Sequence, residues 1–202
     1  GYAEEGSYAF VSKYMANGDV DTSFGNAGLV KLSVAENGID TDKISAMVEQ
    51  SDGKIIVLAE GAGLVRLTIT GGIDVLYSAN TGPVGSLSGL SIQDDNKVLV
   101  IADNRYLMRL ETSGSTDVTF NQGQSIDLSQ YSSGVSIVEV TTSQTNDGNT
   151  LIVGKYNVDH VNALTVLFVL KFSNDGELDT SFNNDGIARF ASADYYIDQA
   201  VA

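Results

Sequence analysis

The sequence predicts an all-β fold, a β-propeller built of about four four-stranded blades. A four-point motif recurs four times with identical spacing, and apolar strands that follow tight turns recur between its copies. No stretch of useful length shows the period of a helix. Units of roughly fifty residues with four short strands each are typical of propeller blades, whereas a β-sandwich has no reason to repeat the same landmarks.

The motif begins with a lysine or arginine, followed five residues later by glycine, eight later by aspartate and eleven later by an aromatic residue. The glycine permits a left-handed turn without the steric cost of a Cβ atom. The aspartate can cap a single helical turn by accepting main-chain amides. We expect the aromatic ring to pack between blades and the cation to reach an acidic partner. The copies are Lys13, Gly18, Asp21, Phe24; Arg66, Gly71, Asp74, Tyr77; Arg109, Gly114, Asp117, Phe120; and Lys171, Gly176, Asp179, Phe182.

A second recurring element lies between the motif copies: an Asp-Gly or Asp-Asn pair followed by an apolar run. Such pairs tolerate the positive φ angles of tight hairpin turns. Because the runs are continuous rather than alternating, we expect these strands to be buried on both faces. The runs are Ile55–Ala59, Val98–Ala102 and Leu151–Gly154.

Two further strands complete each expected unit. One precedes the tight turn, most clearly at Ile44–Val48 and Val135–Val140, and one follows the motif aromatic, as at Gly28–Val34 and Gly186–Phe190. Four strands per unit are thereby predicted.

The expected organisation is a single propeller domain over residues 1–202, with units at about 1–34, 35–84, 85–128 and 129–190 and with 191–202 as the first strand of a split unit. Gly1-Tyr2-Ala3 resembles the end of a second strand, and Tyr196–Ala202 resembles a first strand. The turn and most of the second strand of that unit are missing. We therefore expect a closed or nearly closed ring, or a fragment of a larger propeller.

Composition excludes several classes of function. The 202 residues carry 26 acidic and 11 basic side chains, for a formal charge of −15, and no cysteine. Phosphate binding requires clustered Lys and Arg, so nucleic acid is not an expected partner. The absence of cysteine excludes disulfides, thiolate metal sites and cysteine nucleophiles. The longest apolar stretch, Val161–Leu170, is too short for a membrane span, and no transmembrane segment is expected.

The recurring segments resemble the bacterial delta-60 repeat. The resemblance covers essentially the whole chain, and it departs in the second copy, where Val75-Leu76-Tyr77 replaces the usual Thr-Ser-Phe. It implies propeller blades of a family found mostly in secreted or surface proteins of bacteria, with no general enzymatic activity. The segments that carry it are Tyr8–Tyr14, Asn17–Gly25, Gln50–Val57 and Asn174–Phe182.

Catalytic chemistry has little support, and no catalytic or cofactor-binding residue is assigned. The single histidine, His160, lies in an insertion at Tyr156–Ala163, where a solvated side chain beside Asp159 is the simplest interpretation. No serine stands in a Gly-x-Ser-x-Gly elbow. A catalytic carboxylate pair would depend on distances that sequence spacing does not supply.

Calcium is the one cofactor worth weighing, although none is expected. Asn174–Asp179 resembles half of an oxygen-rich calcium loop, and Asn17–Asp21 is a looser version. The positions upstream of the first loop hold Lys171 and Ser173, which do not fit such a loop.

The preferred function is a non-catalytic binding or scaffold module, extracellular, on the cell surface or periplasmic, that recognises a protein or glycan through loops on one face. The alternative is a carboxylate-dependent glycan hydrolase or lyase on a propeller fold. A third interpretation is a structural spacer within a longer surface protein. Converging acids with raised pKa values would favour the enzyme.

Overall fold

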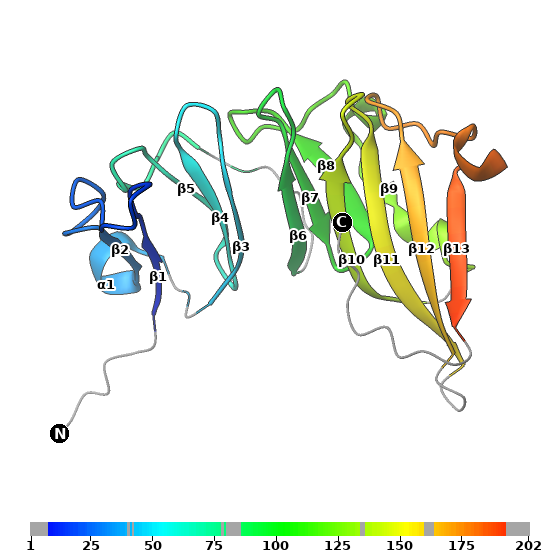
Figure 1. Ribbon diagram of the computed structural model, residues 1–202, viewed down its shortest axis with the longest axis horizontal. Coiled ribbons are helices and arrows are strands. Elements are labelled where there is room, and N and C mark those ends of the chain that lie inside the picture. Colours follow the sequence, from blue (N-terminus) through cyan, green and yellow to red (C-terminus); the bar gives the residue numbers. More distant parts are fainter. Residues whose placement is uncertain are drawn as a thin grey trace. The chain divides into compact units, whose positions relative to one another are not determined.

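The computed structural model describes residues 8–192 except for residues 40, 42, 78, 80–85, 134, 135 and 160–163. The described strands form four antiparallel sheets with two, three, four and four strands (Figure 1). The chain divides into two compact units, Gly1–Ser78 and Ala79–Ala202. The first unit contains the first and second repeats, and the second unit contains the third and fourth. The all-β prediction is confirmed, and the repeats are numbered here in chain order.

The first repeat contributes two described strands, β1 (Ala9–Ser12) and β2 (Leu29–Leu32), with Val11 opposite Val30. The strand predicted at Gly28–Val34 ends two residues early, because α1 (Val34–Asn37) begins there. The side chain of Asn37 accepts a hydrogen bond from the Ser33 amide and donates one to the Lys31 carbonyl, which closes the chain into this single turn.

The second repeat is a three-stranded meander of β3 (Ile44–Glu49), β4 (Ile55–Ala59) and β5 (Gly63–Leu67). The tight turn between β3 and β4 holds Gly53 at a φ of 80°, and the Gln50 amide donates across the turn to the Lys54 carbonyl. The turn predicted from Asp-Gly is confirmed.

The third repeat has four strands, β6 (Leu87–Ile92), β7 (Val98–Ala102), β8 (Tyr106–Leu110) and β9 (Ile126–Asp127). The outermost strand has only two residues. It is flanked by short 3₁₀ helices at Asn121–Gly123 and Leu128–Tyr131, the second capped by the Asp127 carboxylate.

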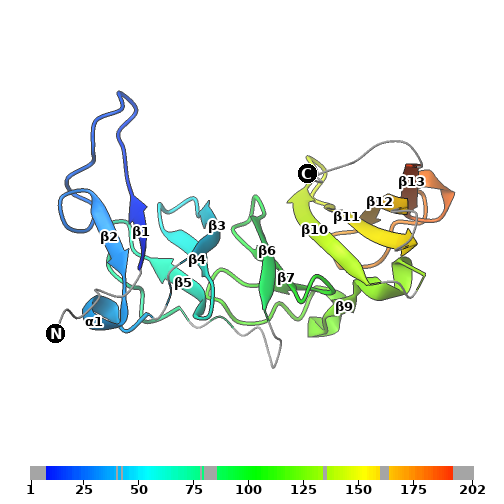
Figure 2. The ribbon, with the colours of Figure 1, turned by 90° about the horizontal axis from the view of Figure 1, so that it is seen from below.

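The fourth repeat also has four strands, β10 (Ile137–Gln144), β11 (Thr150–Asp159), β12 (Leu164–Phe172) and β13 (Ile187–Ser192), with a 3₁₀ helix at Phe182–Asn184 (Figure 2). β11 and β12 span 10 and 9 residues, whereas β4, β5, β7 and β8 have 5 each. The strand predicted at Val135–Val140 continues to Gln144, and residue 135 lies outside the described residues.

Burial of the apolar strands follows the prediction in two repeats and departs from it in the fourth. Every residue of β7 is buried, and only Ile55 of β4 is not. Along β11, in contrast, Ile152, Gly154 and Tyr156 are buried while Leu151 and Val153 are half-buried. Both-face burial is therefore wrong for β11, because one of its faces packs in a core and the other is only partly covered.

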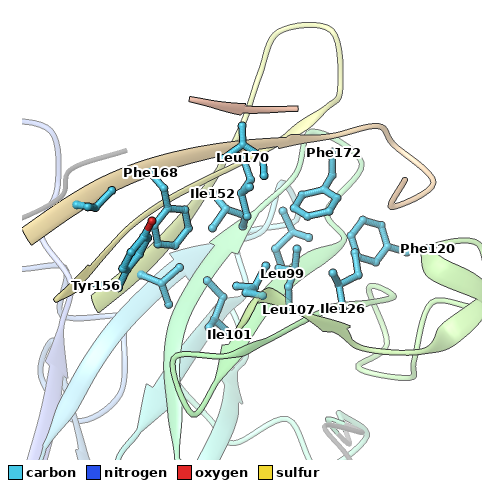
Figure 3. Close-up of a cluster of buried hydrophobic side chains, with 14 residues drawn as sticks. Leu99, Ile101, Leu107, Phe120, Ile126, Ile152, Tyr156, Phe168, Leu170 and Phe172 are labelled. Carbon is cyan, nitrogen blue, oxygen red and sulfur yellow. The ribbon is translucent and has the colours of Figure 1, made fainter. Parts of the chain in front are cut away.

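Each unit has a core formed between its two repeats. In the second unit, Leu99, Ile101 and Leu107 of the third repeat pack with Ile152 and Phe168 of the fourth (Figure 3). In the first unit, residues of β1 and β2 pack with residues of β4 and β5: Val11, Val30 and Leu32 with Val57, Ala59, Val65 and Leu67. Within each unit, the two repeats thus bury one face of each sheet against the other sheet, as stacked blades do.

The four-strand unit is confirmed for the third and fourth repeats, while the described residues supply two strands to the first and three to the second. The terminal segments Gly1–Ala3 and Tyr196–Ala202, on which ring closure was predicted, lie outside the described residues. The single domain and the closed ring remain predictions.

Candidate functional site

The motif turn has the same geometry in all four repeats. Its glycine has a φ between 85° and 92° in every copy, the left-handed region that glycine tolerates best. The motif aspartate accepts a hydrogen bond at Oδ1 from the amide two residues on, and the predicted capping is confirmed. The donors are Ser23, Leu76, Thr119 and Ser181, at 2.8 to 3.1 Å.

The second oxygen of each motif aspartate faces the motif cation. In the third repeat, Arg109 Nε lies 2.6 Å from Asp117 Oδ2, whereas in the first repeat Lys13 Nζ lies 4.0 Å from Asp21 Oδ2. The cation thus reaches an acidic partner, as predicted, and the partner is the aspartate of its own motif. The remaining pairs are Arg66 with Asp74 and Lys171 with Asp179.

The motif aromatic packs between repeats in two described cases. Phe24 and Phe120 are fully buried in the cores of the first and second units, and the Arg109 guanidinium lies 4.7 Å from the centre of the Phe120 ring. Phe182 is only half-buried, so the prediction of a buried plug is wrong for the fourth repeat. Tyr77 is buried, and burial raises its pKa to about 12.

The densest charge cluster lies in the third repeat around Asp117, whose side chain is 0% exposed. Lys97 Nζ lies 2.9 Å from the same Oδ2 atom that binds Arg109, and Thr119 binds Oδ1 through its amide and hydroxyl groups. Burial alone would raise the pKa of Asp117, but hydrogen bonds from Thr119, Lys97 and Arg109 hold it well below its usual range. The carboxylate therefore stays charged.

Main-chain bonds join consecutive repeats beside the motif turns. The Asn121 amide donates to the Asp175 carbonyl at 2.7 Å, and in the first unit the Gly25 amide donates to the Thr70 carbonyl at 2.8 Å. In both cases the donor follows the motif aromatic, and the acceptor precedes the motif glycine of the next repeat. The motif turn thus helps to join the two repeats within each unit.

Hydrogen bonds and ion pairs hold several of the described acids in their ionised form. Every described carboxyl group with a resolved shift has its pKa lowered, which keeps it ionised rather than available as a general acid. In the two segments that resemble calcium loops, Asp179 binds Ser181 and Lys171 while Asp21 binds Ser23. Within the described ranges, no group of three or more His, Asp or Glu side chains is placed to hold a metal ion.

The opposite end of the third and fourth sheets carries the connections β7–β8 and β11–β12. Asp103 and Asn104 both adopt positive φ angles in the β7–β8 turn. The Asn104 side chain donates to the Val138 carbonyl of β10 at 3.1 Å, and Arg105 binds Asp127 through two hydrogen bonds. The turn of the third repeat therefore lies against the start of the fourth.

The long hairpin β11–β12 contains a buried aromatic pair. Tyr156 is buried, and its ring centre lies 5.8 Å from that of Phe168. Next along the hairpin, Thr165 donates to the Asn157 side chain at 3.0 Å. Sequence spacing indicated this insertion, and His160 within it lies outside the described residues.

Apolar side chains are exposed on this hairpin and on the neighbouring strand: Val158 on β11 is 49% exposed and Val138 on β10 is 47% exposed. Between their strands, Lys155 Nζ lies 2.6 Å from Glu139 Oε2. We call this set the hairpin-end surface, which comprises Asn104, Arg105, Val138, Glu139, Lys155 and Val158. No signal in the sequence indicated Asn104 or Val138, because their contact depends on how two sheets stack.

Comparison with known proteins supports the propeller assignment. Residues 145–182 match the model of a family described as "Domain of unknown function (DUF5122) beta-propeller". The segment contains the β10–β11 turn, the long hairpin and the motif of the fourth repeat. The fold and this match together define an all-β protein with propeller-type repeats.

A solved structure that resembles the chain is the extracellular domain of BT4673, a proposed one component system of B. thetaiotaomicron, at 16% sequence identity and a TM-score of 0.46. The alignment covers 75% of this chain and 18% of that one. The chain therefore spans less than a fifth of that chain's length. No curated protein matches the sequence. No helix within the described ranges is long and apolar enough to cross a membrane.

Proposed function

We propose that the protein is a non-catalytic binding or scaffold β-propeller, part of a secreted or surface bacterial protein, that recognises a protein or glycan through its loops. The observation that carries the proposal is the extended β11–β12 hairpin, whose strands are about twice as long as their counterparts and which carries the exposed Val158, with the exposed Val138 on the neighbouring strand β10. Elongated connections on a rigid scaffold are where binding sites concentrate.

The hairpin-end surface suits recognition better than the motif end, by which we mean the end of the sheets that carries the motif turns. At the motif end, Asp117 and Arg109 are buried in mutual contacts, so neither offers its charge to a ligand. At the hairpin end, the Glu139–Lys155 pair is part-exposed beside apolar side chains, and such a pair contributes little to stability. Mixed apolar and polar groups on an exposed edge are typical of transient protein or glycan contacts.

The lowered pKa values speak against the alternative of a glycan hydrolase or lyase. A hydrolase needs one carboxylic acid with a raised pKa facing a second, ionised carboxylate. At Asp117 and Asp127, hydrogen bonds lower the pKa more than burial raises it, so both carboxyl groups favour their ionised forms instead.

The test is a trimmed hairpin. Residues 157–165 are replaced by the three-residue turn Asp103-Asn104-Arg105, because Tyr156 pairs with Val166 as Ala102 pairs with Tyr106. Wild-type chain and variant are screened against soluble polysaccharides and a phage-displayed random peptide library. The matched control is Val118→Ala, an exposed apolar residue in the motif turn of the third repeat.

We expect the wild-type chain and the control to bind the same probes and the trimmed variant to lose them while it keeps its circular dichroism spectrum. Equal binding by the trimmed variant would overturn the assignment of the site. Release of reducing sugar from any polysaccharide would instead favour the enzyme.

The finer form of the fold is likewise our proposal: a closed or nearly closed ring of about four blades, with a fragment of a larger propeller as the alternative. Solution scattering distinguishes them, because a closed ring gives a compact profile and an open arc gives an elongated one.

A further inference from the structure

The sequence contains two Asn-Gly pairs, Asn17-Gly18 and Asn37-Gly38. In such a pair the main-chain nitrogen of the glycine can attack the side-chain amide carbon of the asparagine, because the glycine has no Cβ atom to hinder the approach. The reaction needs no enzyme, and in a folded protein its rate depends on how the pair is held. The two pairs therefore form a matched comparison within one chain.

The first pair lies in the motif turn of the first repeat, where Asn17, Gly18 and Asp19 are all exposed. The Asn17 side chain folds forward along the chain. Its Oδ1 atom accepts a hydrogen bond from the Asp19 amide at 3.1 Å, and its Nδ2 atom donates to Asp19 Oδ2 at 2.8 Å. A side chain that bonds the main chain two residues on closes a ring around the residue between them. The amide carbon of Asn17 is therefore held beside the Gly18 nitrogen.

The second pair is held in the opposite direction. Asn37 is the last residue of α1, and its half-buried side chain folds back toward residues that precede it. Its Oδ1 atom accepts from the Ser33 amide at 3.1 Å, and its Nδ2 atom donates to the Lys31 carbonyl at 2.6 Å. Both bonds must open before the amide carbon can reach the Gly38 nitrogen. The fold thus protects the second pair.

One hydrogen bond opposes attack at the first pair. The Gly18 amide donates to the Met15 carbonyl at 2.9 Å, and the attacking nitrogen must leave this bond. A Cβ atom at Gly18 would have no neighbour within 4 Å, so nothing packs on the turn at this residue. The bond spans three residues of an exposed turn, and local opening of such turns costs little free energy.

We propose that Asn17 is a site of spontaneous deamidation and that Asn37 is protected from it. The Gly18 nitrogen gives its proton to solvent base and bonds to Asn17 Cγ. The Cγ–Nδ2 bond breaks, and the nitrogen leaves as ammonia with a proton from water. Water then opens the cyclic imide, and no atom is oxidised or reduced. Opening at Cγ gives aspartate in normal linkage, whereas opening at the main-chain carbon gives an isoaspartyl linkage through the side chain.

The two products differ in how they fit the motif turn. The fourth repeat has Asp175 at the position of Asn17, so an aspartate in normal linkage is compatible with this turn. An isoaspartyl linkage adds a methylene group to the main chain between Met15 and Asp19, where the Met15 amide donates to the Asp19 carbonyl at 2.8 Å. The isoaspartyl form should therefore lose this turn. The proposal does not rest on the loop recognition proposed above.

The experiment incubates the full 202-residue chain at mildly alkaline pH in water enriched in heavy oxygen, and peptide mapping by mass spectrometry follows conversion at each pair. A parallel incubation in urea removes the fold. The matched control is Asn17→Thr, because Thr70 occupies this position in the second repeat. Anion exchange then separates the products for thermal melting.

In the native chain we expect Asn17 to convert at least about tenfold faster than Asn37, whose part-buried hydrogen bonds add to its barrier. In urea the two rates should be similar, and Asn17→Thr should leave only the slow conversion at Asn37. The isoaspartyl form should melt below the aspartyl form, which should match Asn17→Asp.

Equal rates at the two pairs in the native chain would overturn the proposal. A difference that persists unchanged in urea would overturn it too, because the neighbouring sequence and not the fold would then determine the rates. Equal melting of the two products would contradict the effect assigned to the isoaspartyl linkage.

Discussion

Arg109 binds Asn174 of the following repeat through two hydrogen bonds from Nη1, at 2.7 Å to its main-chain oxygen and 2.8 Å to its side-chain oxygen. Since Nε of the same guanidinium binds Asp117, one side chain both closes the motif of the third repeat and holds the fourth. The motif cation of the first repeat, Lys13, has a long contact with Asp21 and is a third exposed. The ion pair of the motif is therefore short and buried in the third repeat, but long and part-exposed in the first.

Replacement of Arg109 by methionine should destabilise the protein by about 3 kcal/mol, because Asp117 would keep only Lys97 as a cationic partner in a buried site. Lys13→Met should cost less than about 1 kcal/mol, since its pair with Asp21 is part-exposed. Urea denaturation followed by circular dichroism measures both. Equal losses in the free energy of unfolding would show that the buried network around Asp117 stabilises the protein no more than the exposed pair does.

Acid should destabilise the protein through its motif and turn aspartates. The Thr145 hydroxyl and nearby Lys171 lower the pKa of Asp147 to about 2, and the pKa of Asp117 is also lowered. Unfolded aspartates titrate near ~4, so this stabilisation is fully present above pH ~4 and is lost as the pH falls through the folded values. Melting temperatures between pH ~6 and ~2 should show the decline. The gap between wild type and Asp117→Asn should shrink with acid, and a constant gap would contradict this assignment.

Alanine substitutions at two motif glycines should distinguish the cost of a strained backbone from the cost of a steric clash. A Cβ atom at Gly176 would lie 2.9 Å from the Asn121 amide nitrogen, whereas one at Gly18 would have no neighbour within 4 Å. Both residues have nearly equal φ angles, 88° and 89°. Gly18→Ala should therefore cost only the left-handed strain of roughly 1–2 kcal/mol, and Gly176→Ala should cost more. A larger loss at Gly18 in denaturant titrations would contradict the role of Gly176 in stacking.

Alanine substitutions of the motif aromatic residues should also differ in their effect on stability. Phe120→Ala removes a fully buried ring and should cost about 3–5 kcal/mol. Phe182→Ala should cost clearly less, because that ring is only half-buried. Thermal melts of the two variants provide the comparison, and a similar loss from Phe182 would mean that its ring is covered in solution.

Calcium should not alter the melting temperature. In the loop Asn174–Asp179, Asp175 and Asp179 accept hydrogen bonds from Ser173 and Ser181, so their oxygens already have protein donors. Melting in calcium and in chelator, followed by circular dichroism because the chain has no tryptophan, gives the measurement. A clear stabilisation by calcium would require these turns to be reassigned as metal loops.

Local geometry could be predicted from the sequence wherever a few neighbouring residues determine it. The left-handed motif glycines and the capping aspartates follow from side-chain chemistry within a four-residue turn. The half-burial of β11 and of Phe182 could not be predicted from the sequence. An apolar side chain indicates that its position tolerates burial, but not that another sheet covers it. Whether a second sheet covers it depends on stacking.

The candidate site was predictable only in part. Spacing indicated the long hairpin, since the interval from Asp147 to Lys171 exceeds that from Asp52 to Arg66. The contact of Asn104 with Val138 joins residues 34 positions apart, and that of Arg109 with Asn174 joins residues 65 apart. Such pairs leave no periodic signal in a single sequence.

The bond from Asn121 to Asp175, like that from Gly25 to Thr70, uses main-chain atoms at both ends. The donor is asparagine in the first bond and glycine in the second, and the acceptors are aspartate and threonine. The bond itself uses no side-chain atom and requires a left-handed backbone after the aromatic, although a Cβ atom at Gly25 would clash with the Leu29 main-chain oxygen. Two repeats can therefore be joined at this point without a complementary pair of side chains across their contact.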